Sequence, residues 1–158
     1  MIRPCRAEDV ETIRDIADRA WQPIYDMFEE TYGEELFPIL VTNRDTSKSE
    51  QIQSHWERAP EWILICEEEG AIVGFVTFRI DESAGVGEIG NNAVDPNCGL
   101  KGIGQQLYAA ALECFRKHGL KAAKVGTGLD WAHAPARRAY ERAGFDVKHE
   151  TVTYFKKL

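Results

Sequence analysis

The sequence has no long apolar run and no excess of basic residues, and these two absences exclude broad classes of function. No hydrophobic segment approaches the length of a membrane-spanning helix, and the acid-rich amino terminus lacks the apolar stretch of a signal peptide. Lysine and arginine number 19 against 26 acidic residues, which gives a net charge of −7. A protein that binds phosphate backbones needs a basic stripe. We therefore expect neither nucleic acid nor a membrane as a partner.

Cysteine is present but never in a metal-binding arrangement. The four cysteines, Cys5, Cys66, Cys98 and Cys114, show no Cys-x-x-Cys spacing and have no pair of histidines nearby. A zinc site or a redox dithiol would need such spacing. The sequence thus predicts no metal, and reduced thiols favour a cytoplasmic protein.

No repeat, linker or low-complexity segment divides the chain. Its 158 residues, of which 44% are hydrophobic and 28% charged, are typical of an ordinary globular protein. This length can bury a sizeable core. We expect a single domain over residues 1–158.

The periodicity of apolar residues predicts alternating strands and helices. A short first strand is followed by a helix that Pro23 ends or kinks, and a capping-box pattern at Ser47 opens a helix that reaches about Arg58. Three antiparallel strands are expected next, over 62–66, over 72–78 and from about Val86 onward.

The second half of the chain alternates in the same way. A helix from Ile103 ends at Gly119, a strand covers 122–125, and a helix that begins at Pro135 is closed by Gly144. Alternation over 147–155 predicts a final hairpin. This order favours an α/β fold, a mixed sheet with helices on both faces.

A glycine loop between a strand and a helix is the most informative feature. Gly99, Gly102 and Gly104 separate the strand that ends in Val94 from the helix of Ile103. Such a loop directs backbone N–H groups and a helix dipole at one point, which suits a phosphate or pyrophosphate. The spacing fits neither a P-loop nor a dinucleotide fingerprint.

Two motifs in this region resemble those of one enzyme family. Residues 99–104 (GLKGIG) resemble the Gln/Arg-x-x-Gly-x-Gly/Ala acetyl-CoA loop of the GNAT (GCN5-related) N-acetyltransferases, and residues 134–145 (APARRAYERAGF) resemble their "(x)xYExxGF" signature. The resemblance implies the GNAT fold, a mostly antiparallel sheet of about six to seven strands. The fourth and fifth strands of that fold are parallel and splay apart around the cofactor.

The resemblance also implies an activity. It predicts transfer of the acetyl group of acetyl-CoA to a primary amine by direct attack in a ternary complex, without a metal. The acceptor is a small-molecule amine or a peptide amine, and family members often form homodimers. The residues that match the family's cofactor site are Ala93, Val94, Gly99, Leu100, Lys101, Gly102, Ile103, Gly104, His133 and Arg137. A CoA-binding module without catalysis is the alternative.

Two residues match the family's catalytic positions. Glu88 matches a strand glutamate that acts as general base, directly or through water, and alternation would place it on one face with Asn92 and Val94. It could instead face solvent. Tyr140 matches the tyrosine that protonates the leaving thiolate, or it is a buried helix aromatic. A backbone N–H near Val94 is expected to stabilise the oxyanion.

The acceptor side is less defined. Trp21 and Tyr25, from the first two helices, and Asn92 could line the acceptor cleft, although the aromatics could equally belong to the core. Acidic pairs at 29–30 and 34–35 weakly favour a cationic amine. His133 could cap a helix instead of touching the cofactor, Arg137 could be solvated, and Gly99 and Leu100 depart from the family loop.

Overall fold

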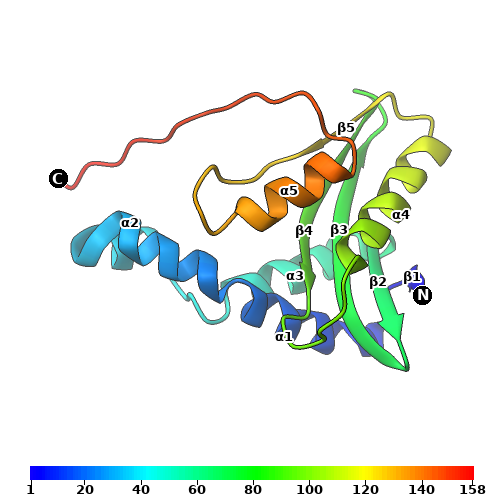
Figure 1. The fold of residues 1–158 in the computed structure, drawn as a ribbon, viewed down its shortest axis with the longest axis horizontal. Helices are drawn as coiled ribbons and strands as arrows, with labels where there is room; N and C mark the ends of the chain where they lie inside the picture. Colours follow the sequence, from blue (N-terminus) through cyan, green and yellow to red (C-terminus); the bar gives the residue numbers. More distant parts are fainter.

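A five-stranded mixed sheet forms the centre of the computed structural model, which describes residues 1–158. The strands lie in the order in which they follow one another in the chain, and all neighbours are antiparallel except the last pair. They are β1 (Ile2–Pro4), β2 (Ile63–Glu68), β3 (Ala71–Asp81), β4 (Val86–Val94) and β5 (Ala122–Val125). The predicted mixed sheet with parallel fourth and fifth strands is confirmed (Figure 1). It has five strands where about six to seven were expected, because no strand follows Val125.

Five α-helices surround the sheet. They are α1 (Val10–Ala20), α2 (Gln22–Leu40), α3 (Ser47–Arg58), α4 (Ile103–Lys117) and α5 (Ala134–Arg142), and single 3₁₀ turns precede α1 and β2 at Ala7–Asp9 and Pro60–Trp62. The predicted break at Pro23 is confirmed, because α1 ends at Ala20 and Pro23 lies in the first turn of α2. None of these helices combines the length and apolar character that a membrane crossing requires.

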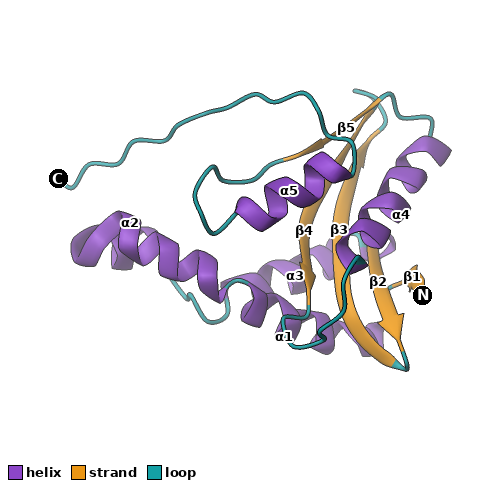
Figure 2. Cartoon of the chain, in the orientation of Figure 1, coloured by secondary structure: helices purple, strands orange, loops and turns teal.

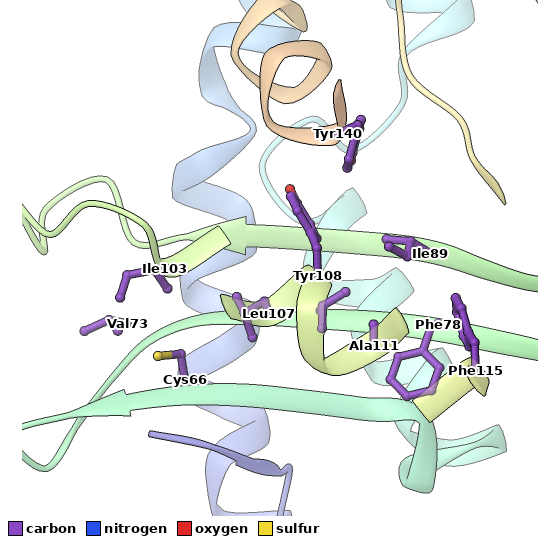
Figure 3. Packing of buried hydrophobic residues seen from close by; sticks show 11 residues of the cluster. Cys66, Val73, Phe78, Ile89, Ile103, Leu107, Tyr108, Ala111, Phe115 and Tyr140 are labelled. Carbon is purple, nitrogen blue, oxygen red and sulfur yellow. The ribbon is translucent and has the colours of Figure 1, made fainter. Parts of the chain in front are cut away.

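The sheet separates two hydrophobic clusters. One lies between the sheet and α4, where Phe78, Leu107 and Phe115 are almost completely buried (Figure 3). The other lies between the opposite face and the helices α1 and α3, around Ile13 and Ile52. This two-sided burial explains why β3 reads as a nearly continuous apolar run.

The helix ends follow local chemistry. Gly119 and Gly144 adopt left-handed φ values of 70° and 97°, each one residue beyond the C-cap of its helix, α4 or α5, as the sequence predicts for residues that close a helix. The predicted helix from Ser47 also forms, but its cap differs. The carboxylate of Asp18 in α1 accepts the N–H of Ser49 at 2.9 Å, so α1 supplies the cap of α3.

The predicted final hairpin over 147–155 is wrong. Residues 145–158, here called the tail, contain no strand and run as an extended loop away from β5 (Figure 2). The end of the tail contacts α2, where Phe155 packs against Tyr32 and Lys157 pairs with Glu35. Alternation specifies which side chains would share a face, but a strand also needs a backbone partner. In this structure β5 ends at Val125 without pairing to the tail.

Candidate active site

A cavity of about 660 Å³ opens where β4 and β5 diverge. Its lining comes from β4 (residues 88–94), β3, the glycine loop, α4, the segment between β5 and α5, α5 itself, the end of α1, the start of α2 and α3. The two strands pair only from Val86 with Ala122 to Ile89 with Val125. Beyond Ile89, β4 therefore has a free edge, which is the splay that the family resemblance predicts.

A bulge in β4 redirects the side chains around this opening. Phe78 of β3 pairs with Ile89, but Val76 pairs with Asn92, so β4 carries one extra residue between these positions. Ile89 packs in the α4 cluster and Asn92 contacts α4, whereas Asn91 contacts α3. The predicted placement of Glu88 and Asn92 on one face is thus wrong, because the bulge reverses the alternation. Both side chains still line the same cavity.

The end of β4 exposes backbone groups to the gap. The N–H of Asp95 donates to the carbonyl oxygen of Val73 in β3 at 2.8 Å. In an antiparallel ladder, neighbouring residues point their backbone groups to opposite sides. The N–H of Val94, which precedes Asp95, is therefore directed toward the splay. Arg19 of α1 fixes this end through Asp95, with N–O distances of 2.6 and 3.3 Å. This contact holds the pKa of Asp95 below its usual value.

The glycine loop brings a helix amino terminus to the cavity. Gly102 has a left-handed φ of 83° and immediately precedes α4, and it lines the cavity together with Gly104. The first N–H groups of a helix have no acceptor within the helix. The side chain of Ile103 is buried in the core and that of Leu100 is 48% exposed. Gly99, Leu100, Lys101 and Ile103 do not line the cavity, and Ile103 can act there only through its backbone.

Tyr140 and Asn92 form the polar centre of the cavity. The amide nitrogen of Asn92 donates to the Tyr140 hydroxyl oxygen at 3.0 Å and to the carbonyl of Gly90 at 3.0 Å. Since a carbonyl only accepts, this contact fixes the amide's orientation. The amide oxygen accepts the Tyr108 hydroxyl at 2.7 Å. Figure 3 shows that hydroxyl pointing from α4 toward Tyr140.

This arrangement leaves the Tyr140 proton free. Because Asn92 donates to its oxygen, the Tyr140 hydroxyl keeps its own hydrogen for another acceptor. Tyr140 is 7% exposed, and burial raises the pKa of its hydroxyl above the usual value. The group is therefore protonated at neutral pH and can donate a proton into the cavity.

Glu88 borders the cavity with two cations beside it. Its carboxylate lies 3.4 Å from the Lys124 ammonium of β5 and 4.0 Å from the Arg79 guanidinium of β3. It faces the α3 side of the sheet, opposite Ile89, and its side chain is 35% exposed. Both the general-base and the solvent-facing interpretations agree with this position.

His133 and Arg137 hold the loop before α5. His133 lines the cavity, and its ring nitrogen Nδ1 lies 2.7 Å from the Asp130 carboxylate, which also accepts the His133 backbone N–H. Arg137 donates to the carbonyls of Gly128 and Asp130 at 2.6 and 2.7 Å. These bonds give Arg137 a structural role, and it does not line the cavity.

The two aromatic residues expected to line the acceptor cleft differ in where they lie. Trp21 lines the cavity, whereas Tyr25 is buried at 4% exposure and lies outside the lining. The acidic pairs at 29–30 and 34–35 also lie outside it, and Arg44 neutralises Glu29. Phe28 and Tyr32 stack on each other 5.4 Å apart and lead to Phe155. The expected acidic wall of the cleft is therefore not formed.

Several lining residues could not be recognised from sequence. One set is a hydrogen-bonded cluster on the face of the sheet opposite α4, formed by Lys48 and Gln51 of α3 and Asn91 of β4. The others are Tyr108 and Gln105 of α4. Gln105 also donates to the Ala139 carbonyl at 2.8 Å and so ties α4 to α5. The acidic cap of α3 and the bulge position these groups, and neither has a clear sequence signature. No cluster of three His, Cys, Asp or Glu side chains could hold a metal ion.

The profile of the Acetyltransferase (GNAT) family matches residues 21–145. This chain belongs to the GNAT family. Mycothiol acetyltransferase of Acidimicrobium ferrooxidans is 32% identical over 96 residues, a match that covers 59% of this chain and 30% of that protein. The chain thus matches less than a third of this relative's length.

Solved structures of other acetyltransferases share the fold of this GNAT chain. PaiA N-acetyltransferase of Thermoplasma acidophilum in complex with coenzyme A superposes with a TM-score of 0.70 at 21% identity, over 96% of this chain and 92% of that one. A GNAT acetyltransferase of Brucella melitensis in complex with acetyl-CoA gives 0.62 at 23% identity, over 93% and 82%. The GNAT fold expected from sequence is confirmed.

Proposed function

We propose that this chain transfers the acetyl group of acetyl-CoA to a primary amine within a ternary complex. One observation carries this proposal. The free edge of β4, the amino terminus of α4 and the Tyr140 hydroxyl all line one cavity. The mycothiol acetyltransferase relative and the neighbours with bound coenzyme A or acetyl-CoA support the choice of donor.

The cavity offers groups that suit acetyl-CoA as the donor. Gly102 and Gly104 border the cavity at the start of α4, where unpaired N–H groups and the helix dipole favour a pyrophosphate. Gly102 needs its left-handed backbone, which a side chain would strain. The edge of β4 beyond Ile89 offers backbone groups to the amide-containing arm of the donor. His133 contacts the donor in this proposal, while Arg137 supports it by holding the loop of residues 128–130.

Each part of the acetyl-transfer reaction is assigned to a different group of this chain. The acceptor nitrogen forms a bond to the thioester carbonyl carbon as the carbon–sulfur bond breaks. The Val94 N–H stabilises the negative charge that develops on the carbonyl oxygen. Tyr140 gives its proton to the departing thiolate, and Asn92 and Tyr108 position its hydroxyl. Glu88, directly or through water, takes the proton that the amine loses.

The experiment is an acetylation screen. The protein and acetyl-CoA are incubated with a panel of amino acids, diamines, aminosugars and short peptides, and products are identified by the mass of one added acetyl group. An acetylated amine that requires the protein supports the proposal. Binding of acetyl-CoA without any product across the panel would contradict it.

A CoA-binding module remains the second candidate because of the position of Glu88. Its carboxylate lies beside both Lys124 and Arg79, and an ordinary surface ion pair has the same arrangement. Glu88→Gln distinguishes the two functions. Loss of turnover that is recovered partly at high pH fits a general base, since a larger fraction of the amine is then neutral.

A further inference from the structure

Lys48 carries a positive charge at a position that disfavours one, and it has no carboxylate partner. It lies in the first turn of α3, where the helix dipole disfavours positive charge. Its ammonium contacts only neutral groups, the side-chain oxygens of Gln51 at 3.1 Å and Asn91 at 3.3 Å and the Trp21 ring, whose centroid is 4.8 Å away. Burial lowers the pKa of the amine, and no nearby acid counteracts this effect.

These contacts hold the charge at the acceptor end of the cavity. Lys48, Gln51, Asn91 and Trp21 all belong to the lining, and the bulge in β4 turns Asn91 toward α3. They lie on the opposite face of the sheet from α4, whose amino terminus is the proposed pyrophosphate site. An ammonium has three donors, and Gln51 and Asn91 occupy two of them.

The charge of the lining is opposite to that of the protein. The chain has a net charge of −7, yet the cavity is lined by Lys48, Arg79 and Arg142 with Glu88 as the only carboxylate. Arg79 lies beside Glu88, so Lys48 is the half-buried cation left without a counter-ion. A cationic acceptor would meet repulsion at this end of the cavity.

We propose that the acceptor is an amine that also carries a carboxylate, such as an amino acid or a peptide with a free carboxyl group, and that Lys48 binds this carboxylate. This inference rests on the proposed function and names its substrate class. The carboxylate supplies the third hydrogen bond and the missing negative charge. It replaces the cationic amine that the acidic pairs at 29–30 and 34–35 suggest from sequence.

The test compares acceptors that differ by one charge. Each L-amino acid is offered beside its own carboxamide, with diamines as the cationic class, and kcat/KM is measured by release of coenzyme A. We expect the best carboxylate acceptor to exceed its carboxamide by at least about tenfold, as for a hydrogen bond to a charged group. This comparison uses the wild-type protein and needs no variant to fold.

Variants assign the preference to Lys48. Lys48→Met should bring the ratio of acid to carboxamide close to one and leave the acetyl-CoA affinity unchanged, whereas Lys48→Arg should retain part of the preference. Lys117→Met is the matched control, because it removes the same charge from an exposed position outside the cavity. It should keep the wild-type ratio.

The outcomes separate this inference from the proposed function. Preference for diamines, for carboxamides or for aminosugars without a carboxylate would overturn the inference while acetyl transfer stands. A preference for acids that survives in Lys48→Met would equally overturn the role of Lys48. If acetyl-CoA binds but no amine of any class is acetylated, the proposed function fails, and the inference fails with it.

Discussion

The end of β4 and the helix α2 differ in what fixes the direction of their side chains. At β4, ladder pairing, a bulge and the Arg19 contact to Asp95 direct Val94 and Asn92 toward one cavity. By contrast, α2 extends away from the sheet (Figure 1), and its aromatic residues contact one another and the tail. Composition suggests a binding wall in α2, but only backbone geometry determines which side chains reach the cavity.

The largest expected difference between the two regions is in stability. Phe115→Ala removes a ring buried against Phe78 and should lower the free energy of unfolding by about 3 to 5 kcal/mol. Phe28→Ala in α2 removes a half-buried ring from an aromatic stack and should cost about 1 to 2 kcal/mol. Urea denaturation measures both. Equal costs would show that α2 belongs to the core as fully as α4 does.

The next difference concerns catalysis. Tyr140→Phe removes the proposed proton donor and should lower kcat at least about 100-fold while acetyl-CoA affinity stays nearly unchanged. The matched control is Tyr25→Phe, a buried tyrosine of α2 outside the cavity, for which kcat should stay near the wild-type value. A wild-type rate in Tyr140→Phe would remove the general-acid role.

A third contrast compares two ion pairs. Asp95→Asn removes the negative charge from a part-buried contact to Arg19 and should lower the free energy of unfolding by about 1 to 3 kcal/mol at pH 7. Asp26→Asn loosens an exposed pair with Arg44 and should cost less than about 1 kcal/mol. Denaturation at pH 7 compares the two variants directly. Similar costs would contradict the special role of Arg19.

The Asp95 effect should also depend on pH. The pKa of Asp95 is lower in the folded protein than in the unfolded chain, so its contribution is present above the unfolded value of about 3.9. The contribution is lost as the pH falls through the lower folded value. The stability difference between wild type and Asp95→Asn should therefore shrink below about pH 4. A difference that stays constant down to pH 2 would contradict the ion-pair explanation.

Sequence reasoning succeeded where a local pattern determines structure. Gly119 and Gly144 mark helix ends, Pro23 marks the break before α2, and the glycine loop precedes α4. It failed where a partner distant in sequence decides. The bulge that separates Glu88 from Asn92 is a property of the β3–β4 register, and the cap of α3 comes from Asp18. Lys48 joins the site through such contacts, so no motif could identify it.

The smallest expected effect tests the acidic stretch of α2. Simultaneous neutralisation of Glu29, Glu30, Glu34 and Glu35 to glutamine should change the acceptor KM by less than about twofold at low salt, because these groups lie outside the cavity. Initial-rate kinetics at two salt concentrations measures this. A large rise in KM would restore α2 as the wall that attracts a cationic acceptor.

Binding of acetyl-CoA at the end of β4 is the central claim, and a thermal-shift titration tests it most directly. At a concentration near 100 times Kd, acetyl-CoA should add about 2.7 kcal/mol and raise Tm by roughly 5 to 11 °C. ATP and NAD should give no comparable shift, and Gly102→Ala should lose most of the acetyl-CoA effect. No shift with acetyl-CoA, or equal shifts with all three ligands, would contradict the account.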